Sequence, residues 1–401
     1  MDKMKKKILV LTSTFPRWKE DAATPPFVLE LSKRLTDKFE VHLLAPLSKG
    51  SQKEEIVEEI HVHRFKYWFN LENNLADGAI LPNLKKNKFL FSQIPFFFLA
   101  QIFAAKRILK KENIKTIHAH WIIPQGFVAV VCKIFFVKDC KIIITTHGAD
   151  IFGLKKMNWL KKWTLSKASK VTVVSNAIKT EAQKIGYGNE IDVIPMGVDL
   201  TAFSPKKRDL NLREKYGAKK GTLLLFVGRL AEKKGVSYLL DAMPKIIEKH
   251  KECKLLIVGS GPLEKKLKEQ TRKLKLEKNV IFTGSIQNSE LPRYYASADI
   301  FIGPSIIAND GDAEGFGLVF VEAMGSETLV ITTDLPAMQD IVQDKKTGFI
   351  VPQKDSISLA NTLLENLKDK KKAQEVALAG KKHVKKFDWK NITKKYAELL
   401  K

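Results

Sequence analysis

The sequence is poor in cysteine, which limits the compartments and sites that it suits. Only three cysteines occur in 401 residues, at Cys132, Cys140 and Cys253. Their spacing matches no metal-binding motif, and three thiols cannot all pair in a disulfide framework. The composition therefore favours a protein of a reducing cytoplasm over a secreted, disulfide-stabilised one.

The sequence also lacks low-complexity tracts and a recognisable targeting segment. Apolar residues make up 44% of the chain and charged residues 28%, a balance that is typical of folded proteins. The first residues, "MDKMKKKILVLTSTFPR", have a basic start, but their apolar stretch of about five residues is too short for a signal peptide. We expect this stretch to form the first β-strand.

No apolar run is long and uninterrupted enough for a clear membrane span. The most apolar segment, "FLFSQIPFFFLAQIFAAKRIL", contains Gln93, Pro95 and Gln101, which makes it a poor transmembrane helix. We expect a buried helix here. The alternative is a helix that lies in a bilayer interface, together with the lysines and tryptophans of residues 155–170.

Acidic residues are scarce relative to basic ones, and the formal net charge is +25. None occurs between Asp150 and Glu181, where residues 154–170 carry six lysines. Such a charge favours polyanionic partners, namely nucleic acid, anionic lipid or phosphorylated substrates, although lysines that merely cover a solvated surface are an equal alternative. The sequence has no zinc knuckle, helix-turn-helix spacing or RNP-like aromatic strand, so we expect no nucleic-acid partner.

Short apolar runs rich in β-branched residues alternate with amphipathic stretches along the whole chain. Helical spacing of apolar residues is clear in 25–37 and 98–113, whereas 65–84 has no clear period and predicts a loop. Apolar strands separated by helices predict parallel sheets covered on both faces, and two such series predict two doubly wound α/β domains. The expected strands are 7–13, 39–46, 60–65, 116–121, 141–148, 170–175, 191–197, 222–229, 253–260, 279–285, 299–305, 328–334 and 347–352.

The break between the two domains is expected in residues 194–217, where apolar periodicity lapses and turn-forming residues cluster. We place it at residue 198. The predicted first domain is then 1–198 and the second begins at 199.

Ligands of open α/β sheets bind beyond the carboxyl ends of the strands, so the loops at these ends are the places to search. The loop in "FVGRLAEKKG" offers Arg229, Lys233 and Lys234, and guanidinium and ammonium groups suit a diphosphate. Ordinary surface cations are the alternative. The turn in "IVGSGPLEKKL" contains Gly259 and could let a ligand approach backbone N–H groups, or it is a tight turn without a ligand.

The stretch "DAEGFGLVFVEAM" is the strongest candidate for a binding site. Gly315 and Gly317 can expose backbone N–H groups at the start of the helix that follows, and a helix N-terminus attracts anions. Glu314 suits a polyhydroxylated group attached to that anion, and Glu322, one turn into the helix, suits the hydroxyls of a ribose. In the alternative interpretation, Glu314 only complements the dipole of the helix that follows, and Glu322 is exposed to solvent.

These motifs, in this order, resemble the retaining glycosyltransferases of family 4, which have the GT-B fold. The resemblance rests on "FVGRLAEKKG", "IVGSGP", the two glutamates separated by seven residues, and the following "AMGSETLVITTDLPAMQDIVQDKKTGFIV". It extends over the N-terminal half through "IHAHW", "THGAD" and "IPMGVD". It implies two Rossmann-like domains that face a cleft, an acceptor-side N-terminal domain, a donor-binding domain at 199–385, and a final helix, about 386–401, that returns to the first domain.

The resemblance also implies roles for individual residues. Arg229 and Lys234 would bind the donor diphosphate, and Glu322 the ribose. Glu314 would contact the hydroxyls of the sugar, aided by the backbone of the residues that follow it. His147, at a strand end of the first domain, would face the donor sugar. The donor-binding set is Arg229, Lys234, Gly259, Glu314, Gly315, Phe316, Gly317, Leu318 and Glu322, and the catalytic set is His147, Glu314, Arg229 and Lys234.

The acceptor side is less well defined by the resemblance. Many members carry a glycine pair after the first strand, whereas this chain has no glycine in residues 12–27, and Asp21 and Thr24 are the candidates there. His118 and His120 alternate on a strand and point the same way. We expect an acceptor-side or packing role for them and no metal, because no acidic or cysteine partner lies nearby in the sequence.

The expected reaction is the transfer of a sugar from a nucleotide diphosphate sugar to an acceptor hydroxyl, with retention of configuration and without a metal or other cofactor. The expected acceptor is a saccharide or a lipid-linked saccharide, met at an anionic inner membrane surface. Two other functions remain open: a sugar-nucleotide epimerase on the same scaffold, and a non-catalytic relative that binds membranes or polyanions.

Overall fold

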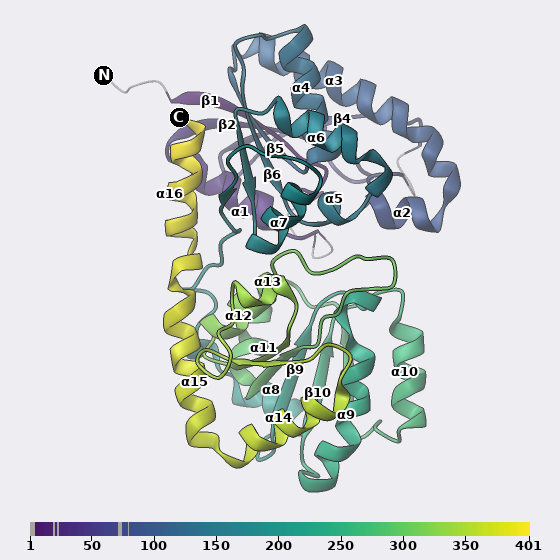
Figure 1. Cartoon of the computed structure of the whole chain (residues 1–401), viewed down its shortest axis with the longest axis vertical. Coiled ribbons are helices and arrows are strands. Elements are labelled where there is room, and N and C mark those ends of the chain that lie inside the picture. Colours follow the sequence, from purple (N-terminus) through teal and green to yellow (C-terminus); the bar gives the residue numbers. More distant parts are fainter. Residues whose placement is uncertain (1–4, 19–20, 22–23, 71–73, 79) are drawn as a thin grey trace. The chain divides into compact units, whose positions relative to one another are not determined.

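The computed structural model describes residues 5–18, 21, 24–70, 74–78 and 80–401 (Figure 1). The chain forms two compact units, Met1–Met196 together with Ile392–Lys401, and Gly197–Asn391. The division lies two residues before the expected boundary at 198, and the chain returns to the first unit at Ile392 instead of at about 386.

The first unit contains an eight-stranded sheet in the order β3-β4-β2-β1-β5-β6-β7-β8. Neighbouring strands are parallel except β3 and β4, and Leu9 of the central β1 lies opposite His42 of β2 and Ile117 of β5. Central strands are buried because helices cover both faces. The strands are β1 Lys6–Leu11, β2 Phe39–Pro46, β3 Glu54–Val57, β4 Ile60–Phe65, β5 Thr116–His120, β6 Lys141–Thr146, β7 Lys170–Val173 and β8 Asp192–Val193.

The helices of this unit alternate with its strands, as the sequence predicts. Helix α3 packs against α4, and Figure 1 shows both beside the sheet. The helices are α1 Phe27–Leu35, α2 Ile80–Lys86, α3 Ile94–Lys111, α4 Phe127–Phe135, α5 Ala149–Phe152, α6 Asn158–Ser166 and α7 Asn176–Lys184, and the short helices are η1 Lys88–Gln93, η2 Ile122–Gly126 and η3 Lys155–Met157.

Two local predictions for this unit are corrected by the structure. Strand β3 was not predicted, since its sequence "EEIV" is polar and it forms an exposed, antiparallel edge. Residues 65–84 do not form only a loop, because α2 begins at Ile80. Residues 71–73 and 79 of this segment lie outside the described part of the chain.

The apolar segment 89–109 is helical, but the prediction that it is buried is wrong for its outer side. Phe97, Ala105 and Leu109 are buried, whereas Phe96 and Phe103 on the opposite side are 50% and 59% exposed. Within the described residues, Lys88–Lys111 is the one helical segment whose length and composition would suffice to cross a membrane.

The second unit contains a six-stranded, wholly parallel sheet in the order β11-β10-β9-β12-β13-β14. Leu224 of β9 lies opposite Leu255 of β10 and Ile300 of β12. All thirteen strands expected from the sequence are present in the two sheets. The strands are β9 Leu223–Val227, β10 Lys254–Val258, β11 Val280–Gly284, β12 Ile300–Gly303, β13 Leu329–Thr333 and β14 Phe349–Val351.

Helices of the second unit pack their apolar faces on this sheet and form its core with the strands. The helices are α8 Leu210–Lys215, α9 Val236–Lys249, α10 Glu264–Lys273, α11 Leu291–Ser297, α12 Leu318–Gly325, α13 Pro336–Gln339, α14 Ser356–Lys368, α15 Lys370–His383 and α16 Trp389–Leu400, and the short helices are η4 Pro205–Lys207, η5 Glu232–Lys234 and η6 Val384–Phe387. The residues of α16 from Ile392 onward belong to the first unit.

Candidate functional site

The strongest candidate from the sequence lies at the start of α12. Gly317 precedes the helix with φ +84°, a backbone conformation that side-chain-bearing residues rarely adopt. The Phe316 side chain is buried and its ring meets Phe387, with ring centroids 5.4 Å apart. Residues 315–318 therefore offer mainly backbone N–H groups to a ligand, which is the arrangement that the sequence predicts for an anion site.

Lys234 and Glu314 form an ion pair at this place, and their side chains are only 14% and 15% exposed. The neighbouring Lys233 bonds through Nζ to Asp312 Oδ1 at 3.1 Å. Burial raises the pKa of Glu314, but the charges of Lys234 and Lys233 more than offset this and hold the pKa below its usual value. The structure thus brings together the cation and the carboxylate that the sequence placed 80 residues apart.

Arg229 lies on the same strand-end loop and is exposed. Among the described residues, no carboxylate forms an ion pair with its guanidinium. An exposed cation on the loop that also carries Lys234 suits an incoming anion.

Glu322 lies one turn into α12 and accepts a hydrogen bond from the Tyr295 hydroxyl at 2.8 Å. Burial raises the pKa of Glu322 to about 7. Tyr295 is completely buried, and its ring packs against Phe203 and Phe301. The sequence analysis missed Tyr295, because nothing in its local sequence connects a tyrosine of α11 with a carboxylate of α12.

Gly259 has a structural reason to be glycine whether or not a ligand binds. Its φ is +127°, and a Cβ atom there would lie 2.1 Å from the carbonyl oxygen of Gly228. The two loops are joined by backbone bonds, from Gly228 N–H to Val258 O and from Leu230 N–H to Ser260 O, both 2.9 Å. The turn thereby fixes the loop that carries Arg229.

His147 of the first unit lies just beyond β6, within a group of aromatic rings. Its Nε2 lies 3.0 Å from His120 Nδ1, and its ring centroid lies 4.9 Å from those of Phe27 and Trp121. Burial lowers the pKa of His147 to about 3, so the imidazole is neutral at physiological pH.

Asp150 holds the loop after β6 and was missed by the sequence analysis. Its carboxylate accepts hydrogen bonds from the backbone N–H groups of Ile122, His147 and Gly148, at 2.8, 3.3 and 3.2 Å. Burial raises the pKa of Asp150. The available signal was the position of Asp150 at the start of a short helix, where a carboxylate commonly caps N–H groups.

His118 and His120 point the same way, as expected, with ring centroids 4.3 Å apart. Both are completely buried. His118 Nε2 lies 2.8 Å from Thr145 Oγ1, and burial lowers its pKa to about 3. Of the two roles that the sequence left open, packing describes their position better, and His120 additionally contacts His147.

Asp21 and Thr24 belong to an internal network. Both Asp21 oxygens accept from the Arg17 guanidinium, at 2.8 and 3.0 Å, and Asp21 also accepts from Thr24 Oγ1 at 2.8 Å. Burial raises the pKa of Asp21, but the bonds from Arg17 and Thr24 bring it well below its usual range. The two residues therefore brace the loop after β1, and their contact with an acceptor stays a prediction.

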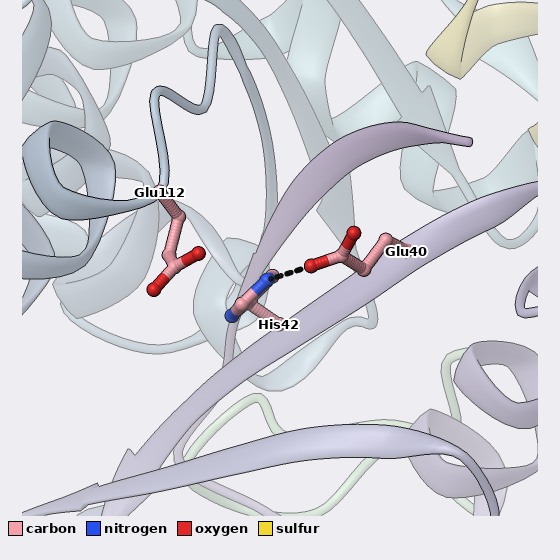
Figure 2. Close-up of side chains that lie close together, drawn as sticks. All are labelled: Glu40, His42 and Glu112. Carbon is pink, nitrogen blue, oxygen red and sulfur yellow. Dashed lines mark hydrogen bonds and ion pairs between the residues drawn. The ribbon is translucent and has the colours of Figure 1, made fainter. Parts of the chain in front are cut away.

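One group of side chains in the described part of the chain has metal-ligating atoms within 4.8 Å of one another: Glu40, His42 and Glu112 (Figure 2). His42 Nε2 lies 3.1 Å from Glu40 Oε1. The Lys7 ammonium lies 3.1 Å from Glu40 and 2.8 Å from Glu112, and so supplies these carboxylates with a cation. Glu40 and His42 lie near the amino end of β2, away from the strand ends that carry His120 and His147.

A cavity of about 680 Å³ opens in the second unit, but it contains none of the predicted donor residues. It lies at the amino ends of the parallel strands, where Thr222, Cys253 and Leu329 contribute to its wall. Ligands of such sheets bind at the opposite, carboxyl ends, so we assign the donor site to the loops that carry Arg229 and Glu314.

Two family models match the chain one after the other. Residues 26–202 match "Glycosyltransferase Family 4", and residues 209–383 match "Glycosyl transferases group 1". Together the models span most of both units.

Similar proteins agree with this assignment. The chain is 26% identical to N-acetyl-alpha-D-glucosaminyl L-malate synthase of Bacillus anthracis, over 80% of this chain and 82% of that protein. It is 27% identical to the GDP-mannose-dependent alpha-(1-6)-phosphatidylinositol monomannoside mannosyltransferase of Mycobacterium tuberculosis, over 74% and 78%.

Solved structures show the same fold. Sucrose-phosphate synthase from Thermosynechococcus elongatus superposes with a TM-score of 0.79 at 21% identity, over 98% of both chains. Anabaena HepE in complex with UDP-glucose has a TM-score of 0.72 at 20% identity, over 98% of this chain and 99% of that one. The chain therefore belongs to the family 4, group 1 glycosyltransferases and has their GT-B fold of two Rossmann-like domains.

Proposed function

We propose that this glycosyltransferase moves a sugar from a nucleotide diphosphate sugar to an acceptor hydroxyl, with retention of configuration and without a metal ion. The observation that carries the proposal is the meeting of Lys234, Glu314 and the N-terminus of α12, with the exposed Arg229 on the loop that also carries Lys234. The breaking bond leaves negative charge on the diphosphate, and fixed cations and N–H groups stabilise such charge without having to reorganise.

Each member of this group has a distinct proposed role. Arg229 and Lys234 bind the diphosphate, and the N–H groups of residues 315–318 donate hydrogen bonds to its remaining oxygens. Lys234 and Glu314 already form an ion pair before the donor binds. We propose that the donor phosphate then binds on the Lys234 side of this pair and a sugar hydroxyl on the Glu314 side. Glu322, oriented by Tyr295, accepts hydrogen bonds from the ribose.

Retention of configuration at the anomeric carbon can arise in two ways. The acceptor attacks from the face that the leaving group departs from, or the sugar first forms a covalent intermediate with the enzyme. No carboxylate is assigned as a nucleophile, so we propose the same-face route. The bond from the anomeric carbon to the diphosphate oxygen breaks, the bond to the acceptor oxygen forms on that face, and the acceptor proton passes to the departing phosphate. We propose that the neutral imidazole of His147 contacts the sugar during this step.

The nature of the acceptor is proposed by analogy with similar proteins. One of them is named as a phosphatidylinositol monomannoside mannosyltransferase, which acts on a lipid-linked saccharide by its name. We propose a saccharide or lipid-linked saccharide, used in glycolipid or polysaccharide synthesis on the inner face of a membrane.

The test compares donor-site variants with matched surface variants of the same unit. We expect Arg229→Ala and Glu314→Gln to lower transfer by about 100-fold or more, the scale of losing a transition-state contact. Melting temperatures should stay close to that of the wild type. Arg272→Ala and Glu277→Ala, at exposed positions of the same unit, should retain activity. Full turnover by either donor-site variant would refute the assignment.

Two further measurements separate the alternatives. An epimerase would convert the donor sugar without an acceptor and without releasing nucleoside diphosphate, and a non-catalytic relative would release none under any condition. Activity that persists in excess chelator supports metal independence, and activity restored only by a divalent cation contradicts it.

A further inference from the structure

Helix α3 exposes large apolar side chains on the face that points away from the core. Phe89 and Phe91 of η1 are 88% and 55% exposed, and Phe96, Leu99 and Phe103 of α3 are 50%, 52% and 59% exposed. The last three are spaced i, i+3, i+7 and so share one face of the helix. Single exposed apolar residues are common on proteins, but a continuous row of this kind marks an interaction surface.

The end of α4 extends this row. Ile134 and Phe135 are 41% and 70% exposed, and Lys106 of α3 lies 4.6 Å from the ring centroid of Phe136, which follows α4. Figure 1 shows α3 and α4 side by side. We call the exposed side chains of residues 89–103 and 134–135 the α3 face.

Basic residues lie at both ends of the α3 face. Residues 78–138 contain ten lysines and arginines but a single acidic residue, Glu112. Lys86 and Lys88 are exposed before the first phenylalanines, and Arg107 and Lys110 continue the exposed side of α3 after Phe103. An apolar centre between clusters of cations matches a bilayer surface with anionic headgroups, and a protein partner would need a matching acidic rim.

The opposite side of α3 shows that the helix cannot leave the domain to span a bilayer. Phe97 is completely buried, and its ring centroid lies 5.1 and 4.9 Å from those of Phe65 and Tyr67. Gln101, Ala105 and Leu109 continue this buried side. The helix must therefore lie along the bilayer surface, with only its outer side in the lipid.

We propose that the α3 face is a docking surface for an anionic lipid bilayer. The aromatic and leucine side chains enter the boundary between headgroups and acyl chains, and the exposed lysines bind lipid phosphates, whereas Arg107 lies 3.9 Å from Glu54 of β3. The proposal rests on the membrane location in the proposed function and assigns the surface that meets the membrane. Its test measures binding without turnover, so binding and catalysis can each fail alone.

The experiment uses the full chain with vesicles of phosphatidylcholine, with and without phosphatidylglycerol. We expect co-sedimentation with the mixed vesicles and much weaker binding to phosphatidylcholine alone. Phe89→Gln/Phe96→Gln/Phe103→Gln should bind the mixed vesicles at least tenfold more weakly. The matched triple variant Leu210→Gln/Ile357→Gln/Leu378→Gln removes exposed apolar residues of the second unit and should bind like the wild type.

A charge variant separates electrostatic from apolar binding. Lys86→Gln/Lys88→Gln/Lys110→Gln should lose the preference for phosphatidylglycerol, whereas Lys265→Gln/Lys266→Gln/Lys273→Gln in the second unit should keep it. Equal losses in both lysine variants would mean general charge attraction and would overturn the proposal. The proposal would also be overturned if the wild type did not bind vesicles. Self-association of the wild type that the phenylalanine variant abolishes would likewise overturn it, because the α3 face would then bind a second copy of the chain.

Discussion

At the scale of single residues, the buried carboxyl group of Glu322 links ligand binding to pH. Its pKa is raised from 4.5 to about 7 by burial, so the folded protein holds a proton there that the unfolded chain releases. This group therefore stabilises the fold most below pH 4.5, and its contribution falls as the pH rises through 7. Ribose hydroxyls favour the charged carboxylate, so their binding releases the proton.

We therefore predict that a nucleoside diphosphate binds more tightly as the pH rises. From pH 6 to 8 the dissociation constant should fall by about tenfold, the effect of a pKa that drops by two or more on binding. Calorimetry on the wild type and on Glu322→Gln provides the measurement. The Glu322→Gln variant should show only the pH dependence that comes from the ligand's own phosphate. If the dissociation constant of the variant changes with pH as much as that of the wild type, Glu322 does not bind the ribose.

His120 is predicted to be a positioning residue that acts through His147. One of the two rings donates to the other across 3.0 Å, which fixes the tautomer and direction of the His147 imidazole. Replacement by phenylalanine retains the ring packing but removes the bond. We expect His120→Phe to lower kcat about tenfold with little change in KM for the donor, the cost of one lost hydrogen bond.

A purely structural role would give a different result for His120→Phe. It would lower the melting temperature and leave kcat of the folded fraction unchanged. His118→Phe is the matched variant, because His118 bonds to Thr145 and not to His147. Equal kcat losses in both variants would argue against the positioning role.

Three of the donor-site residues proposed from the sequence lie on loops at a strand end or just before a helix, where spacing alone suggests exposure to a ligand. Arg229, Lys234 and Glu314 are of this kind. Asp150 was missed although two of its three backbone contacts, with His147 and Gly148, are local. Tyr295 was missed because its bond to Glu322 joins two elements that are distant in sequence. The Lys234–Glu314 pair was likewise not predicted as a pair, since residues 80 positions apart meet only once the sheet is formed.

At the scale of elements, the strand-end loops of the second unit are held by backbone contacts that tolerate no Cβ atom. We predict that Gly259→Ala lowers the free energy of unfolding by more than about 2 kcal/mol, since φ +127° and the carbonyl oxygen of Gly228 both oppose the methyl group. It should also weaken nucleotide binding, because it displaces the Arg229 loop.

The control for Gly259→Ala is Gly284→Ala at the end of β11. Gly284 also has a positive φ, +73°, but a Cβ atom there would meet no atom within 4 Å. It should lose only about 1 kcal/mol from backbone strain and bind nucleotide normally. Chemical denaturation and calorimetry measure both effects. Equal behaviour of the two variants would show that loop contact does not decide the result.

Elements were most predictable where burial makes a strand apolar throughout, as in β9 and β12, which are buried along their whole length. Strand β3 escaped because an exposed edge strand need not be apolar. The buried side of α3 was predicted correctly, but composition alone could not show that its outer side stays uncovered. Whether the outer side of α3 is covered depends on which other elements the topology places against it.

At the scale of the whole molecule, the first unit is built from two distant parts of the chain. Ile392, Tyr396, Ala397 and Leu400 of α16 are all at most 1% exposed. Tyr396 donates its hydroxyl to Ile194 O at 3.0 Å, and its ring centroid lies 5.4 Å from that of His118. The last ten residues are therefore part of this unit's core, although the second unit precedes them in sequence.

We predict that deletion of residues 392–401 destabilises the first unit selectively. Removing four buried apolar side chains costs several kcal/mol, since full burial of each large one stabilises by about 1.5–3 kcal/mol. Calorimetry should show an early transition of the first unit, while nucleotide still stabilises the second. Lys394→Ala/Lys395→Ala, which alters only exposed residues of the same helix, should melt like the wild type. A truncated chain with a single unshifted transition would show that α16 contributes little to this core.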